Sequence, residues 1–235
     1  VYAFIHAVSS RLREGQVTVV GNGSACVVGG HAYIIKKGQR FITNSAIASM
    51  GYDLPAAIGA WTASRDKGCY SQGGDRSGDD LILVTGDGSM QMNLPELQTI
   101  IHHRMGIKIF VINNGGYHSI RQTQKNFFGE PLIGIGVDSG DLSFPALDKL
   151  AAAYGYPYVS ARHNSELGEA VEKTLAAEGP VICEVFVSMD QNFEPKSSAK
   201  RLPDGTMVSP PLEDLSPFLP DEEMDENMII PRIKG

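Results

Sequence analysis

Short apolar runs alternate with longer amphipathic segments along most of the chain. The apolar runs have the length and composition of buried strands, which we expect at Val17–Val20, Arg40–Thr43, Leu81–Thr85, Ile107–Ile112, Tyr156–Val159 and Val181–Val187. The segments between them show helical spacing and predict helices at Tyr2–Arg13, Ala25–Tyr33, Tyr52–Ser64, Asn93–Arg104, Tyr117–Phe128, Phe144–Tyr154 and Ser165–Ala177. Alternation of this kind is typical of an α/β fold, a doubly wound parallel sheet with helices on both faces.

Two stretches depart from this alternation. Residues 68–80 are polar and rich in glycine, which predicts a surface loop. From Asp190 onward the sequence is acidic and rich in proline, with no clear period, which indicates an extended C-terminal tail. We therefore expect two parts, a domain over residues 1–188 and a tail over residues 189–235.

Composition narrows the classes of function. The chain has 235 residues, a net charge of -7 and a pI near 5.3, so a nucleic-acid partner is not expected. No apolar run approaches the ~20 residues of a membrane span, and the N-terminus lacks a charged region followed by an apolar stretch and a cleavage site, so we expect neither a membrane span nor a secretion signal. The three cysteines, Cys26, Cys69 and Cys183, form no CxxC pair and are expected to be buried thiols in a reducing cytoplasm. Because the chain opens at Val1 within an amphipathic pattern, we expect a fragment of a longer protein.

Two turns rich in glycine and oxygen ligands follow neighbouring strands of the predicted sheet. Gly86-Asp87-Gly88-Ser89 follows the strand at residues 81–85, and Asn113-Asn114-Gly115-Gly116 follows the strand at residues 107–112. Either turn alone is common. Only 24 residues, one helix and one strand, separate Gly88 from Asn113, so a single crossover brings both turns to the carboxyl edge of the sheet, where ligands of such folds bind. The helix between them has its own start signal, an Asn N-cap at Asn93 with Pro95 in the first turn.

Gly-Asp-Gly, about two dozen residues and then Asn-Asn resembles the diphosphate and magnesium motif of thiamine-diphosphate enzymes. The resemblance extends to residues 39–44, to Met50-Gly51-Tyr52-Asp53-Leu54-Pro55 and the residues that follow it, and to Gly86 through Gln124. Over roughly residues 1–188 the chain is similar to the C-terminal domain of acetolactate synthase-like proteins.

This resemblance implies a set of ligands for thiamine diphosphate and Mg²⁺. The carboxylate of Asp87, the side-chain oxygen of Asn114 and the backbone carbonyl of Gly116 would hold Mg²⁺, whose preference for oxygen ligands suits them. Backbone N–H groups of Gly88 and Ser89 would face the diphosphate, and a second set would come from the turn that follows the first strand. The full set of expected cofactor-binding residues is Asn22, Gly23, Ser24, Met50, Gly86, Asp87, Gly88, Ser89, Asn114, Gly116 and Tyr117.

The resemblance also suggests roles for three individual side chains. Met50 is placed as the apolar prop that keeps the cofactor bent, although a methionine is also an ordinary core residue. Asp53 stands where relatives usually have glycine, and its carboxylate is expected to cap the following helix. His118 is a candidate for facing the substrate.

The implied activity is that of a thiamine-diphosphate-dependent lyase or transferase. Such an enzyme decarboxylates a 2-oxo acid such as pyruvate and transfers the acyl carbanion to an acceptor, with the cofactor as electron sink. The catalytic glutamate of the family lies in an N-terminal pyrimidine-binding domain, of the same or a second subunit, so we expect this chain alone to be inactive and the whole protein to be a homodimer or tetramer. Two alternatives stay open, a non-catalytic thiamine-diphosphate-binding module and an acetyl transferase acting on a keto sugar.

Overall fold

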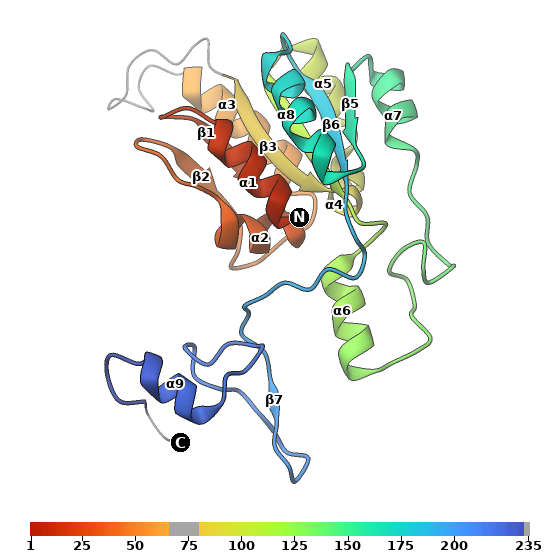
Figure 1. Ribbon diagram of the computed structural model, residues 1–235. Helices are drawn as coiled ribbons and strands as arrows, with labels where there is room; N and C mark the ends of the chain where they lie inside the picture. Colours follow the sequence, from red (N-terminus) through yellow and green to blue (C-terminus); the bar gives the residue numbers. More distant parts are fainter. Residues whose placement is uncertain (66–79, 233–235) are drawn as a thin grey trace. The chain divides into compact units, whose positions relative to one another are not determined.

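The computed structural model describes residues 1–65 and 80–232, and Figure 1 shows its course. Six strands of the described residues form one parallel sheet in the order β2-β1-β3-β4-β6-β5. Their bounds are β1 Val17–Val20, β2 Arg40–Ile42, β3 Leu81–Gly86, β4 Ile107–Asn113, β5 Tyr158–Ala161 and β6 Val181–Phe186. The predicted α/β class and parallel sheet are confirmed.

Helices cover both faces of this sheet (Figure 1). One layer contains α1 Tyr2–Arg11, α2 Ser24–Ala32 and α8 Leu167–Ala176, and the other contains α3 Asp53–Arg65, α5 Glu96–His102 and α7 Leu147–Tyr154. Apart from Lys108, the fully buried residues of the central strand β4 are apolar on both faces, as expected of a strand covered on both sides. On one face Phe110 packs against Phe4 of α1, with ring centroids 5.8 Å apart, and on the other Ile109 belongs to a core shared with Leu54 and Leu97.

Two predicted boundaries, the starts of one helix and of one strand, differ from those in the structure because of the residues beside them. The helix expected from Phe144 begins at Leu147, because the residue before Pro145 is disfavoured in helical backbone. The strand expected from Tyr156 begins at Tyr158, because the cap of α7 at Gly155 has left-handed backbone and precedes it directly. The hydroxyl of Tyr156 donates a hydrogen bond to the carbonyl of Leu97.

The helix expected at residues 93–104 is shorter, and the Asn93 cap is wrong. A short helix, α4 Asp87–Met90, and a 3₁₀ turn, η1 Gln91–Asn93, precede α5, whose N-cap is Pro95. The side chain of Asn93 donates instead to the carbonyl of Gly51, 2.6 Å away. A tertiary hydrogen bond thus replaces the local cap. Two further helical segments are α6 His118–Phe127 and the 3₁₀ turn η2 Asn164–Glu166 that leads into α8.

The chain divides into two compact units, Val1–Gln191 and Asn192–Gly235. The second unit is not extended throughout. It contains a small hairpin of β7 Lys200–Arg201 and β8 Met207–Val208, and the helix α9 Asp221–Asn227. Acidic residues in the first turn of α9 suit the positive end of the helix dipole, and Arg232 forms ion pairs with Asp221 and Asp225.

The predicted loop and the expected buried cysteines can be compared with the structure only in part. The loop predicted at residues 68–80 lies, apart from Asp80, outside the described residues, as does Cys69. Cys183 is buried, as expected, but Cys26 is only half-buried. Within the described ranges, no helix combines the length and the apolar character that crossing a bilayer would require.

Candidate cofactor site

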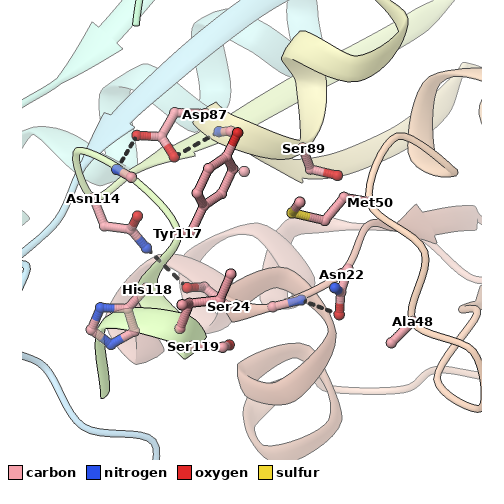
Figure 2. A pocket seen from close by; sticks show the side chains of 15 residues that line it. Asn22, Ser24, Ala48, Met50, Asp87, Ser89, Asn114, Tyr117, His118 and Ser119 are labelled. Carbon is pink, nitrogen blue, oxygen red and sulfur yellow. Dashed lines mark hydrogen bonds between the residues drawn. The ribbon is translucent and has the colours of Figure 1, made fainter. Parts of the chain in front are cut away.

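One pocket of about 290 Å³ lies at the carboxyl ends of β1, β3 and β4. Register places the two turns side by side, since Gly86 pairs with Ile112. The pocket is lined by Asn22, Gly23, Ser24, Ala48, Met50, Gly86, Asp87, Gly88, Ser89, Asn114, Gly116, Tyr117, His118, Ser119 and Ile120 (Figure 2). The structure therefore brings all of the predicted cofactor-binding residues, and His118, to the wall of one cavity.

Asp87 begins α4 immediately after β3, and its carboxylate is buried beside the pocket. Oδ1 accepts the N–H of Gly88 at 2.9 Å and Oδ2 accepts the N–H of Gly116 at 3.0 Å, as the dashed lines of Figure 2 show. The second bond joins the two turns directly. Desolvation by burial outweighs these hydrogen bonds and raises the pKa of Asp87 from 3.8 to about 6. A carboxylate whose charge is so poorly compensated is a suitable ligand for a cation.

Asn114 presents a free oxygen in this buried wall. Its side-chain nitrogen donates to the hydroxyl of Ser24 at 3.0 Å (Figure 2), which fixes the orientation of the amide. Oδ1 is buried and has no hydrogen-bond partner among the described residues. Buried polar atoms are rarely left without a partner, so this oxygen is available to a bound ion, ligand or water in the pocket.

The turn between β1 and α2 is preorganised by its own side chains. Gly23 has left-handed backbone, with φ of 66°, and its N–H donates to Oδ1 of Asn22 at 2.6 Å. The N–H groups of Gly23 and Gly88 thus already have acceptors within the chain. Ser24 and Ser89 lie in the first turns of α2 and α4, where backbone N–H groups have no acceptor within the helix.

Met50 lies at the pocket wall and is 37% exposed (Figure 2). The following residue, Gly51, has φ of 81°, and a Cβ there would approach the Cβ of Met92 to 2.6 Å. The N–H of Gly51 donates to the hydroxyl of Ser89 at 2.9 Å, and its carbonyl accepts from Asn93. The backbone beside Met50 is therefore held from both sides.

Tyr117 covers Gly88 and explains why that position is glycine. A Cβ on Gly88 would collide with the ring of Tyr117, which makes an edge-to-face contact with Phe144 at 5.7 Å between centroids. Tyr117, which lines the pocket, is thus packed against both Gly88 and Phe144.

His118, at the start of α6, is buried and both ring nitrogens have partners. Nε2 donates to the carbonyl of Gln191 at 2.7 Å, which leaves Nδ1 to face Nη1 of Arg121 at 3.5 Å. Desolvation, aided by the nearby charge of Arg121, lowers the pKa of His118, so the ring is neutral near pH 7. Both ring nitrogens are thus engaged within the chain, and the substrate-facing role of His118 stays a prediction.

Asp53 is the first residue of α3, and its carboxylate bonds to one group in this helix and to one in a neighbouring strand. Its Oδ1 accepts the N–H of Leu54 at 3.1 Å, while Oδ2 accepts the hydroxyl of Thr85 in β3. The side chain is fully buried beneath Gly21, where a Cβ would lie 2.6 Å from Oδ2. The carboxylate thus ties α3 to the strand that carries Asp87.

Three lining residues were not predicted, namely Ala48, Ser119 and Ile120. Ser119 and Ile120 directly follow His118 at the start of α6, so their proximity to the site could have been inferred. Ala48 gives no such signal, and its φ of 55° is unusual for a residue with a Cβ.

Comparison with known proteins identifies the family. Residues 21–185 match the model of the thiamine pyrophosphate enzyme, C-terminal TPP binding domain. The chain belongs to this family. The resemblance to acetolactate synthase-like proteins is thereby confirmed, and thiamine diphosphate is the cofactor that this domain family implies.

Curated relatives of this TPP-binding domain include acetolactate synthases. The chain is 31% identical over 157 residues to acetolactate synthase of Arthrospira platensis, which covers 67% of this chain and 24% of that protein. It is 29% identical over 178 residues to the isozyme 2 large subunit of Escherichia coli (strain K12), covering 76% of this chain and 29% of that protein. The chain thus spans about a quarter of the length of these relatives.

Among solved structures, benzoylformate decarboxylase from Polynucleobacter necessarius superimposes with a TM-score of 0.67 at 19% identity. The match covers 81% of this chain and 33% of that one. This likeness supports the TPP-binding fold.

Proposed function

We propose that the pocket binds thiamine diphosphate and that Asp87, Oδ1 of Asn114 and the carbonyl of Gly116 hold Mg²⁺ against the diphosphate. The observation that carries this proposal is the unpartnered, buried Oδ1 of Asn114, fixed by the bond from its amide nitrogen to Ser24. Among protein side chains the amide oxygen is a hard ligand of the kind that Mg²⁺ prefers.

The donor set fits a metal shared with a phosphate ligand. One carboxylate, one amide oxygen and one carbonyl supply three oxygens, whereas Mg²⁺ requires six in octahedral geometry. Diphosphate oxygens and water would complete the shell. The first turns of α2 and α4 supply N–H groups near Ser24 and Ser89 for the remaining negative charge.

Bound thiamine diphosphate would supply an electron sink for breaking the bond between the carboxylate and the carbonyl carbon of a 2-oxo acid. This chain's own residues act by positioning and electrostatics. Met50 offers an apolar support from a backbone fixed by Ser89 and Asn93, and Tyr117 excludes water from the side of Gly88.

For the whole protein we propose an acetolactate synthase-like reaction, decarboxylation of pyruvate or a similar 2-oxo acid followed by transfer of its acyl unit to an acceptor. The support is the relationship to acetolactate synthases of Arthrospira platensis and Escherichia coli. An N-terminal pyrimidine-binding domain, of the same or a second subunit, would complete the site in a dimer or tetramer.

The test is calorimetric titration of thiamine diphosphate into the 235-residue chain with and without Mg²⁺. We expect binding that requires Mg²⁺ and that Asn114→Ala weakens strongly, because one metal ligand is lost. Asn164→Ala, in η2 and outside the pocket lining, is the matched control and should bind as the wild type does. Binding that is equal with and without the metal, or unchanged in Asn114→Ala, would contradict the proposal.

A further inference from the structure

Arg121 of α6 lies beside the turn that carries the proposed metal ligands, without lining the pocket itself. Its side chain is 1% exposed, although it carries a permanent charge. Buried charges require complete compensation, so the partners of this guanidinium indicate what it does.

All five N–H groups of Arg121 have acceptors. Nε and Nη2 form a bidentate pair with the carboxylate of Asp138, at 2.8 and 2.9 Å. Nη1 donates to the carbonyl of Asn114 at 3.2 Å and faces Nδ1 of His118 at 3.5 Å, and Nη2 also donates to the carbonyl of Gly115 at 3.2 Å. One planar group therefore holds two successive carbonyls of the turn and is itself held by Asp138.

The segment of residues 135–137 is hydrogen-bonded to the turn of residues 114–117. The N–H of Tyr117 donates to the carbonyl of Ile135 at 2.7 Å, and the N–H of Val137 donates to the carbonyl of Gly115 at 3.1 Å. Gly116 and Gly136 face each other so closely that a Cβ on Gly116 would lie 2.8 Å from the Cα of Gly136. Asp138 directly follows this segment and links it to Arg121.

We infer that Arg121, held by Asp138, is a positioning residue that fixes the orientation of the Asn114–Gly116 peptides for metal binding. With the carbonyls of Asn114 and Gly115 drawn to the guanidinium, the turn can offer only Oδ1 of Asn114 and the carbonyl of Gly116 to the cation. The inference rests on the proposed function. It assigns a specific contribution to residues that touch neither metal nor cofactor.

The test compares the Mg²⁺ concentration for half-maximal thiamine diphosphate binding among variants of the 235-residue chain, by calorimetry. Arg121→Lys keeps the charge but cannot reach both carbonyls and the carboxylate, so we expect half-saturation at about 10- to 100-fold higher Mg²⁺. Asp138→Asn removes the bidentate charge pair while keeping the shape, and should shift the same quantity in the same direction. Because Asp138 is 22% exposed, this variant keeps the test decisive if Arg121→Lys does not fold.

Lys108→Met is the matched control for loss of a buried cation. Lys108 is fully buried in strand β4, pairs with Asp80 at 3.1 Å and is not part of the pocket lining. This variant should lower the unfolding midpoint yet keep Mg²⁺ half-saturation within about twofold, as expected of independent sites. If the wild type binds thiamine diphosphate but Arg121→Lys and Asp138→Asn both keep its Mg²⁺ half-saturation, the inference is overturned and the proposed function stands. A wild type without Mg²⁺-dependent binding would overturn both.

Discussion

Replacing Asp87 by asparagine should stabilise the metal-free chain while destroying its metal site. Burial raises the pKa of Asp87 from 3.8 to about 6, which corresponds to a penalty of about 3 kcal/mol for the ionised folded state at pH 7. Asparagine has no charge to desolvate. It keeps one acceptor oxygen, for the N–H of either Gly88 or Gly116, and leaving the other N–H without its acceptor costs about 1 kcal/mol or slightly more. We therefore expect Asp87→Asn to gain about 1 to 2 kcal/mol at pH 7.

The sign of the pH dependence follows from the raised pKa. A carboxylate whose folded-state pKa exceeds its unfolded value binds protons more tightly when folded, so the wild type recovers stability relative to the variant as the pH falls through about 6. At pH 5 about half of the penalty remains, and the advantage of Asp87→Asn should nearly vanish. Urea unfolding in EDTA at pH 7 and pH 5 measures this, with the exposed Asp148→Asn as the control. A variant less stable than the wild type at pH 7, or an advantage independent of pH, would refute the reasoning.

Three further predictions follow from individual contacts. Gly116→Ala, at φ of 149° and facing a backbone carbonyl, should lower the unfolding free energy by about 1–3 kcal/mol in urea, whereas Gly30→Ala, in open helical surroundings, should raise it by about 0.5–1 kcal/mol. Met50→Ala should change that free energy little because the side chain is partly exposed, yet weaken thiamine diphosphate binding about tenfold by calorimetry; unchanged affinity would remove the prop from the account. Burial raises the pKa of the Cys183 thiol to about 11, so peptide mapping after iodoacetamide treatment at pH 8 should find Cys26 modified well before it, and equal rates would contradict this.

The sequence predicted the site where chemistry and topology coincide. Asp87 and Asn114 each follow an apolar strand, and parallel pairing of neighbouring strands brings strand ends together without any knowledge of side-chain packing. The pattern also predicted the order of alternating strands and helices. It could not predict the start of α7 at Leu147, which follows Pro145. Nor could it predict the start of α5 at Glu96, because the side chain of Asn93 bonds to the carbonyl of Gly51 and does not cap the helix.

Arg121 and Asp138 show why the rest of the site could not be predicted. The two residues lie 17 positions apart, on a helix and on an irregular segment, and no periodicity relates them. Besides Asp138, Arg121 bonds mainly to the backbone carbonyls of Asn114 and Gly115, which carry no residue-specific signal in a sequence. Likewise, the bonds that occupy the N–H groups of Gly88 and Gly23 depend on side-chain rotamers of Asp87 and Asn22, which only the folded chain determines.

The central claim is that Mg²⁺ and a diphosphate together occupy the pocket beside Asp87, and thermal melting of the 235-residue chain tests it most directly. With thiamine diphosphate and Mg²⁺ at about 100 times the dissociation constant, stabilisation of about 2.7 kcal/mol should raise the midpoint by roughly 5 to 10 °C. Free thiamine with Mg²⁺, thiamine diphosphate with EDTA, and Asp87→Ala with both ligands should each show almost no rise. An equal rise for Asp87→Ala, or for free thiamine, would contradict the account.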